Sequence, residues 1–166
     1  MFRIALLLMA AQAPARDLSD AEVAHVAVTA NSIDIELARL AQQRSFSQHV
    51  RSFANTMITD HGTVNEQALA LARRLGATPQ DNALSQALTE GGRQARRAVE
   101  DLRGRAFDRA YMDREINYHQ AVLTAIDDVL VPSTENAELL RLLASVRPAI
   151  VAHLEHARRI KSLLGS

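Results

Sequence analysis

The 166-residue chain contains no cysteine and no tryptophan, and its single lysine is Lys161. The lack of cysteine excludes disulfides, thiolate metal sites, CxxC redox chemistry and cysteine nucleophiles. One lysine near the end of the sequence gives little basis for a lysine Schiff base or a Walker-type phosphate site. The chain also has no excess of charge of one sign, because 19 Lys plus Arg balance 19 Asp plus Glu. This balance argues against a nucleic-acid-binding surface. The six histidines are therefore the residues of greatest chemical interest.

The first fifteen residues have the pattern of a secretory signal peptide. Arg3 precedes an apolar run over residues 4–11, and the small residues Ala13 and Ala15 mark a cleavage site. The run has about half of the roughly 20 residues that a membrane span needs, so no stable span is expected. We predict a signal peptide over residues 1–15, a single helical domain over 16–166, and a periplasmic or otherwise exported location. The alternative is the frayed apolar start of a cytosolic protein.

Apolar residues after Leu18 recur at intervals of three and four, and no segment alternates as a half-buried strand does. This pattern predicts an all-α chain, with helices over about 19–45, 47–75 and 104–130. A tight loop over 131–134 then leads into a last helix, which Pro148 is expected to kink. The segment 81–103 has a narrower apolar stripe and is expected to be a helical crossover. The architecture that fits is a four-helix bundle with this crossover between its second and third helices.

Three histidines fall within the inward-facing stripes of three different helices: His61, His119 and His153. If the crossover spans the bundle, His61 and His119 lie about 21 Å from one end and His153 about 15 Å from it. Buried imidazoles need partners, and one metal ion can satisfy several of them. We therefore expect one transition metal (zinc, iron, copper or manganese) and no organic cofactor. Glu36, at the edge of the first helix's stripe, is the best-placed carboxylate for a fourth metal ligand.

The remaining candidates have secondary positions. Glu115 lies one turn before His119 and could orient that ring from behind. His156 flanks the stripe of the last helix as a reserve ligand, whereas His25 and His49 are expected at the surface. Only one Glu-x-x-His occurs, at residues 22–25, which disfavours a carboxylate-bridged di-iron oxidase. The sequence has no phosphate-binding glycine loop, no Gly-x-Ser-x-Gly and no His-Glu-x-x-His, so it identifies no enzyme class.

Several segments along the chain resemble an exported bacterial family known as domain of unknown function 4142. The segments that carry the resemblance are residues 18–22, 35–41, 53–61 and 107–111, together with His119 and the pair at 153–154. The resemblance covers about residues 18–164 and implies a ferritin-like helical fold, a signal peptide and an envelope or periplasmic location. It implies no established activity. The recurring positions of the family coincide with the four candidate ligands.

Two main functions remain open from the sequence alone. The first is an exported ferritin-like protein that binds one transition metal in the bundle core through His61, His119, His153 and Glu36. The second is a non-enzymatic envelope module with a hydrogen-bonded histidine core, which would contact an envelope protein or form a homo-oligomer. A third is a metal-dependent redox enzyme acting on peroxide or oxygen, which the missing second Glu-x-x-His disfavours. No catalytic residues are predicted.

Overall fold

A computed structural model describes residues 18–165, and every regular element in this range is helical. The predicted signal peptide, residues 1–15, lies outside the described residues. The elements in chain order are α1 (Asp20–Arg44), α2 (Gln48–Arg74), α3 (Ala83–Glu100), α4 (Gly104–Ala125), the π-helical turn η1 (Ile126–Leu130), α5 (Val131–Ser133) and α6 (Ala137–Leu163). The prediction of an all-α chain is confirmed.

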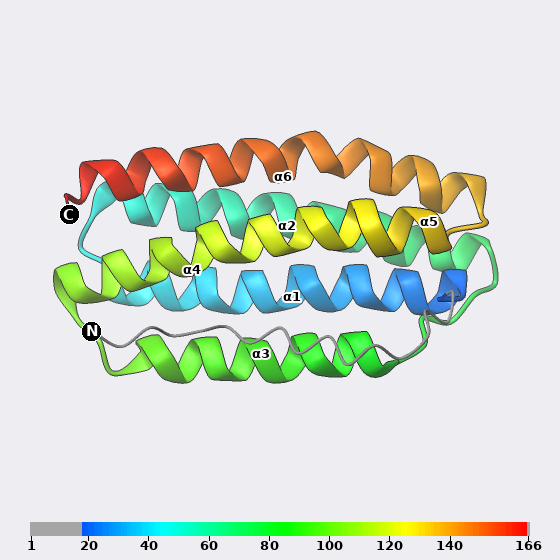
Figure 1. The fold of residues 1–166 in the computed structure, drawn as a ribbon, viewed down its shortest axis with the longest axis horizontal. Helices are drawn as coiled ribbons and strands as arrows, with labels where there is room; N and C mark the ends of the chain where they lie inside the picture. The colour runs from blue at the N-terminus through cyan, green and yellow to red at the C-terminus, as the bar shows by residue number, and fades with distance from the viewer. Residues whose placement is uncertain (1–17, 166) are drawn as a thin grey trace.

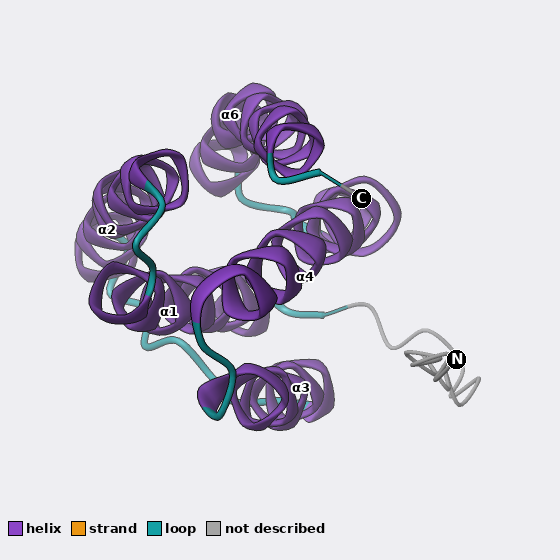
Figure 2. Cartoon of the chain, turned by 90° about the vertical axis from the view of Figure 1, so that its left-hand side faces the viewer, coloured by secondary structure: helices purple, strands orange, loops and turns teal. Residues whose placement is uncertain are grey.

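The helices run back and forth along one axis (Figure 1). α3 crosses the length of the bundle, so α4 runs in the same direction as α2, while α1 and α6 run the opposite way. Viewed end-on, α1, α2, α4 and α6 form the bundle, and α3 packs outside it against α1 and α4 (Figure 2). The helical crossover and the parallel course of the second and third bundle helices are thus as the sequence predicts. No helix among residues 18–165 is long and apolar enough to cross a membrane.

Helix ends follow local capping chemistry. Ser19 caps α1 in a capping box with Glu22, so the first turn's free N–H groups find acceptors. Ser47 caps α2, which ends at Arg74 before Gly76, whose φ of 63° is the left-handed geometry that glycine adopts without strain. These ends agree with the sequence prediction.

The end of the third bundle helix differs from its prediction. We expected a loop over residues 131–134, but the helix continues through η1 and α5 as far as Ser133. Pro132 has no N–H to donate, and in a regular α-helix its ring would clash with a carbonyl one turn earlier. A wider π-helical turn lies just before the proline, and in it the Val131 N–H donates a hydrogen bond to the Ile126 carbonyl. This turn accommodates the proline within the helix. In the last helix, α6 likewise continues through Pro148 as one element, bowed in Figure 1.

α3 approaches α1 most closely at Gly92. A Cβ at this position would lie 2.8 Å from Cγ2 of Ile33, whereas a Cβ at Gly91 would meet nothing within 4 Å. The missing side chain at Gly92 therefore allows α3 to pack against α1.

The apolar core forms two clusters along the bundle axis. One includes Leu37, Phe53, Met57 and Tyr111, and the other includes Val23, Leu123 and Leu154. On each bundle helix the two clusters are contributed by different stretches, and buried polar residues lie at or near the point where the stretches meet. A polar layer therefore crosses the middle of the bundle, and we call it the buried polar layer.

Candidate metal centre

The buried polar layer combines residues from all four bundle helices. Its members are at most 8% exposed, and they are Asn31 and Asp34 of α1, His61 of α2, Glu115 and His119 of α4, and His153 of α6. Polar groups enclosed between two apolar clusters are costly unless each finds a partner. The hydrogen bonds and ion pairs of the polar atoms in this layer therefore indicate which kind of ligand it could bind.

The three predicted histidines meet in this layer. The ring centroids of His61 and His119 are 5.7 Å apart, and His153 lies 5.4 Å from each of them. One ring nitrogen from each residue lies within 4.8 Å of those of the other two. Three nitrogens bound tetrahedrally to one ion at 2.0–2.1 Å would be about 3.4 Å apart, so small side-chain movements would close the arrangement.

His61 is held by a chain of hydrogen bonds to α1. Its Nδ1 donates to Asn31 Oδ1 at 2.7 Å. The amide nitrogen of Asn31 donates to Asn65 Oδ1 at 3.0 Å, so the Asn31 oxygen faces the imidazole. Asn65 in turn donates to Ser32 Oγ at 3.2 Å. This chain places a proton on Nδ1 and fixes the orientation of the ring.

The other two rings are fixed in the same manner. His119 Nδ1 donates to the backbone carbonyl of Glu115 at 2.9 Å, one turn earlier in α4. His153 Nε2 donates to Asp60 Oδ2 at 2.9 Å, which ties α6 to α2. The His153 side chain is 7% exposed and that of Asp60 is 45% exposed, so this tether faces the solvent.

Among the residues that the structure describes, the second nitrogen of each ring has no hydrogen-bond partner. These atoms are His61 Nε2, His119 Nε2 and His153 Nδ1, and all three are buried. Burial lowers the pKa of His119 to about 4, against an opposing effect of the Asp34 charge. The pKa of His153 is lowered as well, because burial outweighs the opposing effect of its hydrogen bond to Asp60. His119 and His153 are therefore neutral at pH 7 and present lone pairs, which is the state that binds metals.

Two carboxyl groups whose pKa values are shifted in opposite directions lie beside the imidazoles. Burial alone would raise the pKa of Asp34. The Arg114 guanidinium and His61 together lower it by more than burial raises it, so the net shift is downward and Asp34 is ionised. Burial and the charge of Asp34 raise the pKa of Glu115 well above its usual value, against the effect of Arg114. Asp34 Oδ2 lies 3.1 Å from His61 Nε2, and neither atom has a hydrogen bond of good geometry. Asp34 thus adds an anionic oxygen next to His61 Nε2.

Comparison with known proteins places the chain in a family. Residues 6–160 match the family described as Domain of unknown function (DUF4142). The chain belongs to this family. The predicted resemblance is therefore confirmed, while the ferritin-like designation and export stay predictions. No curated protein matches the chain.

A solved structure shares the fold of this DUF4142 protein. It is described as "CopM in the Cu(II)-bound form" and superposes with a TM-score of 0.65 at 16% sequence identity. The match covers 87% of this chain and 98% of that one. At this level of identity the likeness shows a common helical-bundle fold.

The structure places the fourth predicted ligand, Glu36, away from the three histidines. Glu36 is exposed and lines a shallow groove between α1 and α3, together with Gly92 and Arg96. Asp34 takes the inward position instead. Two residues correspond to about 200° of helix rotation, so these two carboxylates face in nearly opposite directions.

Sequence reasoning missed four residues of the layer and its supports: Asn31, Asp34, Asp60 and Arg114. A signal for Asp34 was present, since it continues the three- and four-residue spacing of Ala30, Leu37 and Ala41. Nothing in the stripes indicated Asp60 or Arg114. Each reaches the layer through a long-range contact, Asp60 to His153 and Arg114 to Asp34.

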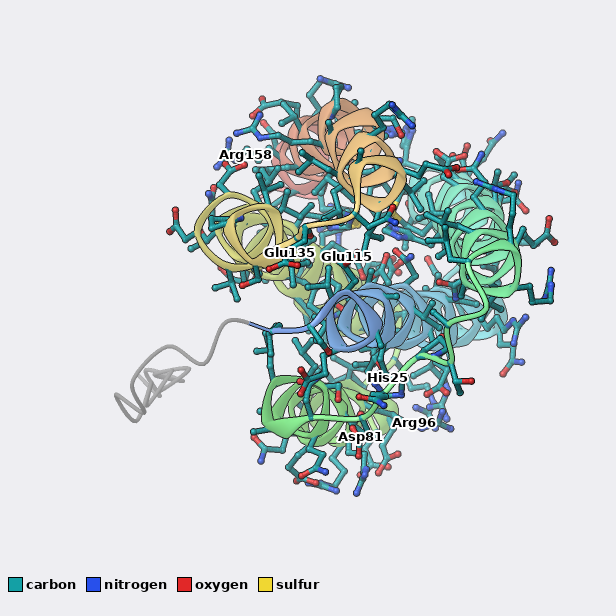
Figure 3. The ribbon with its side chains drawn as sticks, turned by 90° about the vertical axis from the view of Figure 1, so that its right-hand side faces the viewer. His25, Asp81, Arg96, Glu115, Glu135 and Arg158 are labelled. Atoms are coloured by element: carbon teal, nitrogen blue, oxygen red, sulfur yellow. The ribbon has the colours of Figure 1, made fainter. Side chains whose placement is uncertain are left out.

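The remaining histidines lie outside the layer. His49 is exposed, as predicted, while His25 is only partly exposed and lies 3.8 Å from Asp81. Figure 3 shows His25 and Asp81 on the side where α3 packs, whereas Glu115 points into the bundle. The ring of His156, the reserve ligand, contacts Phe53 at a centroid distance of 5.4 Å. The Glu115 carboxylate lies near His119, with Oε2 3.5 Å from Nδ1, but the ring is oriented by the backbone carbonyl of Glu115 and not by its carboxylate.

Proposed function

We propose that this DUF4142 protein binds one divalent transition-metal ion in its buried polar layer, through His61, His119, His153 and Asp34. The observation that carries the proposal is the hydrogen bonding of the two ring nitrogens in each histidine. Each ring has one nitrogen bonded to an acceptor, and its other nitrogen is buried without a partner beside the other two rings. Metal-bound histidines typically donate their second N–H in this way, which fixes the ring orientation.

The alternative of a hydrogen-bonded histidine core fits this pattern poorly. A core of that kind would use both nitrogens of each ring, because an unsatisfied buried polar atom costs about 1–3 kcal/mol. Among residues 18–165, His119 Nε2 and His153 Nδ1 are atoms of this kind, and His61 Nε2 has only Asp34 Oδ2 near it, at 3.1 Å. A bound cation would satisfy the three nitrogens at once, with Asp34 beside it.

The donor set bears on the identity of the metal. Imidazole nitrogens suit zinc, copper, iron and nickel, and among divalent ions copper binds such sites most tightly. The structure that shares this fold holds Cu(II). We infer that Cu(II) is the first candidate and Zn(II) the second. The proposed place of action is outside the cytoplasm, which rests on the signal peptide predicted over residues 1–15.

The test is metal binding by tag-free protein freed of metal and then exposed separately to Cu(II), Zn(II), Fe(II) and Mn(II). We expect one tightly held ion per chain by elemental analysis after dialysis. The variant His61→Ala, His119→Ala, His153→Ala should hold none, while His49→Ala, at an exposed position, should behave as the wild type. A wild-type protein that retains none of the four metals would refute the proposal.

A further inference from the structure

A second group of potential ligands overlaps the first. One atom each from Asp34, Glu115 and His119 lies within 4.8 Å of the others, and all three residues are buried. This group shares Asp34 and His119 with the proposed metal site. His119 has one lone-pair nitrogen, so only the carboxyl oxygens of Asp34 and Glu115 can serve a neighbouring cation while the histidines hold the first.

Arg114 already supplies one positive charge at this second group. Its Nη1 donates to Asp34 Oδ1 and, at 2.6 Å, to Glu115 Oε1. The side chain is 10% exposed, and its guanidinium carbon lies 3.9 Å from the centroid of the Tyr118 ring. Tyr118 is itself anchored by a 2.7 Å hydrogen bond to the carbonyl of Ala30. The guanidinium is thus held between α1 and α4 by two carboxyl groups and an aromatic face.

In both Asp34 and Glu115, the two carboxyl oxygens have different surroundings. Each has one oxygen on Arg114, while its other oxygen, Asp34 Oδ2 or Glu115 Oε2, is buried without a hydrogen-bond partner. Asp34 Oδ2 faces the histidine group, where it lies 3.1 Å from His61 Nε2. Carboxyl groups with one oxygen on a cation and the other directed away are arranged to bridge two positive centres.

We propose that Arg114 occupies the place of a second metal ion and so limits the layer to one metal, while it holds Asp34 as a ligand for that metal. Arg114 is a positioning residue in this scheme, because it acts through Asp34. The inference rests on the proposed function, since it assumes a metal at the three histidines. Removing the guanidinium while keeping both carboxyl groups leaves Asp34 and Glu115 as the protein ligands of a second site, which water would complete.

The test is the number of Co(II) ions bound per chain, measured by elemental analysis after dialysis and by visible absorption during titration. We expect one ion for the wild type and two for Arg114→Met. Arg114→Lys retains a positive charge and should bind one. Arg105→Met, which removes an exposed arginine from the same helix, should also bind one. In Arg114→Met combined with Glu115→Gln, the second ion should be lost.

Several results would overturn the inference. They are two ions in the buried layer of the wild type, one ion in folded Arg114→Met, or a second ion that persists in the double variant. If Arg114→Met does not fold alone, refolding with Co(II) should restore the helical circular dichroism with two ions bound, and failure to do so would also overturn it. A wild type that binds no metal would instead refute the proposed function.

Discussion

At the scale of single residues, the buried polar layer depends on which of two similar carboxylates points inward. Asp34 is fully buried and contacts Arg114 and His61, whereas Glu36 is exposed on the opposite face of α1. Both lie within one helical turn and near the same depth in the bundle. Rotation about the helix axis therefore decides which of them can reach a metal held by the histidines.

This difference predicts unequal effects of two matched substitutions. Asp34→Asn keeps the shape of the side chain but removes an anionic ligand, so we expect metal affinity to fall about tenfold or more. Glu36→Gln should leave the affinity unchanged, because its carboxylate faces the α3 side. Competition with a chromophoric chelator measures both. Equal losses in the two variants would contradict the assignment of Asp34.

The lowered pKa of His119 predicts a dependence of stability on pH. The folded state takes up this proton near pH 4, but the unfolded state takes it up near its ordinary value of 6.5. Between these values the unfolded state binds more protons, so the free energy of unfolding falls as the pH decreases from about 6.5 to about 4. The contribution of His119 over this range is about 3 kcal/mol.

Glu115 acts in the opposite direction, because its raised pKa means that the folded state holds a proton which the unfolded state has released. The contribution of His119 to the pH dependence of stability is therefore obtained by subtracting the stability of a His119 variant from that of the wild type at each pH. Urea unfolding of metal-free wild type and His119→Gln at pH 7, 6, 5 and 4 should show a steeper loss of stability for the wild type toward acid. Parallel curves would mean that burial does not lower the pKa of His119.

At the scale of helices, the contact between α1 and α3 depends on a missing side chain at Gly92. Gly91→Ala should stabilise the protein by about 0.5–1 kcal/mol, because alanine favours helix and its Cβ meets open space. Gly92→Ala should gain less or lose stability, because the new Cβ requires the Ile33 side chain to move. Urea unfolding of the two variants at pH 7 provides the comparison. Equal gains would show that α3 can move away from α1 without cost.

The helices were also the part of the structure most readily predicted from the sequence. The three- and four-residue spacing of apolar residues and signals such as Ser19 and Gly76 act within one or two turns, so a sequence contains them in full. The continuation through Pro132 was missed, because a π-helical turn depends on how a whole helix packs. Asp60 and Arg114 were missed for a related reason, since each reaches the layer from a helix other than that of the residue it contacts.

At the scale of the whole molecule, the proposed site joins all four bundle helices through α1, α2, α4 and α6. A metal bound there would stabilise the folded state alone. At 100 times the dissociation constant this amounts to about 2.7 kcal/mol, or a rise in Tm of about 5–10 °C for a domain of this size. Thermal unfolding followed by circular dichroism, with and without Cu(II), should show this rise in the wild type. The same rise in His61→Ala would place the stabilising ion elsewhere.

α1 differs from the other bundle helices because it is packed on both sides, by α2 and α4 toward the bundle and by α3 from outside. Amide hydrogen exchange should therefore be slowest in the middle of α1, where Asn31 and Asp34 lie. α6 packs against α2, α4 and the turn before it, and it carries His153, whose partner Asp60 is half exposed. We therefore expect amide exchange to be faster in α6 than in the middle of α1, and we expect an ion to enter the layer on the α6 side, where Asp60 reaches the solvent.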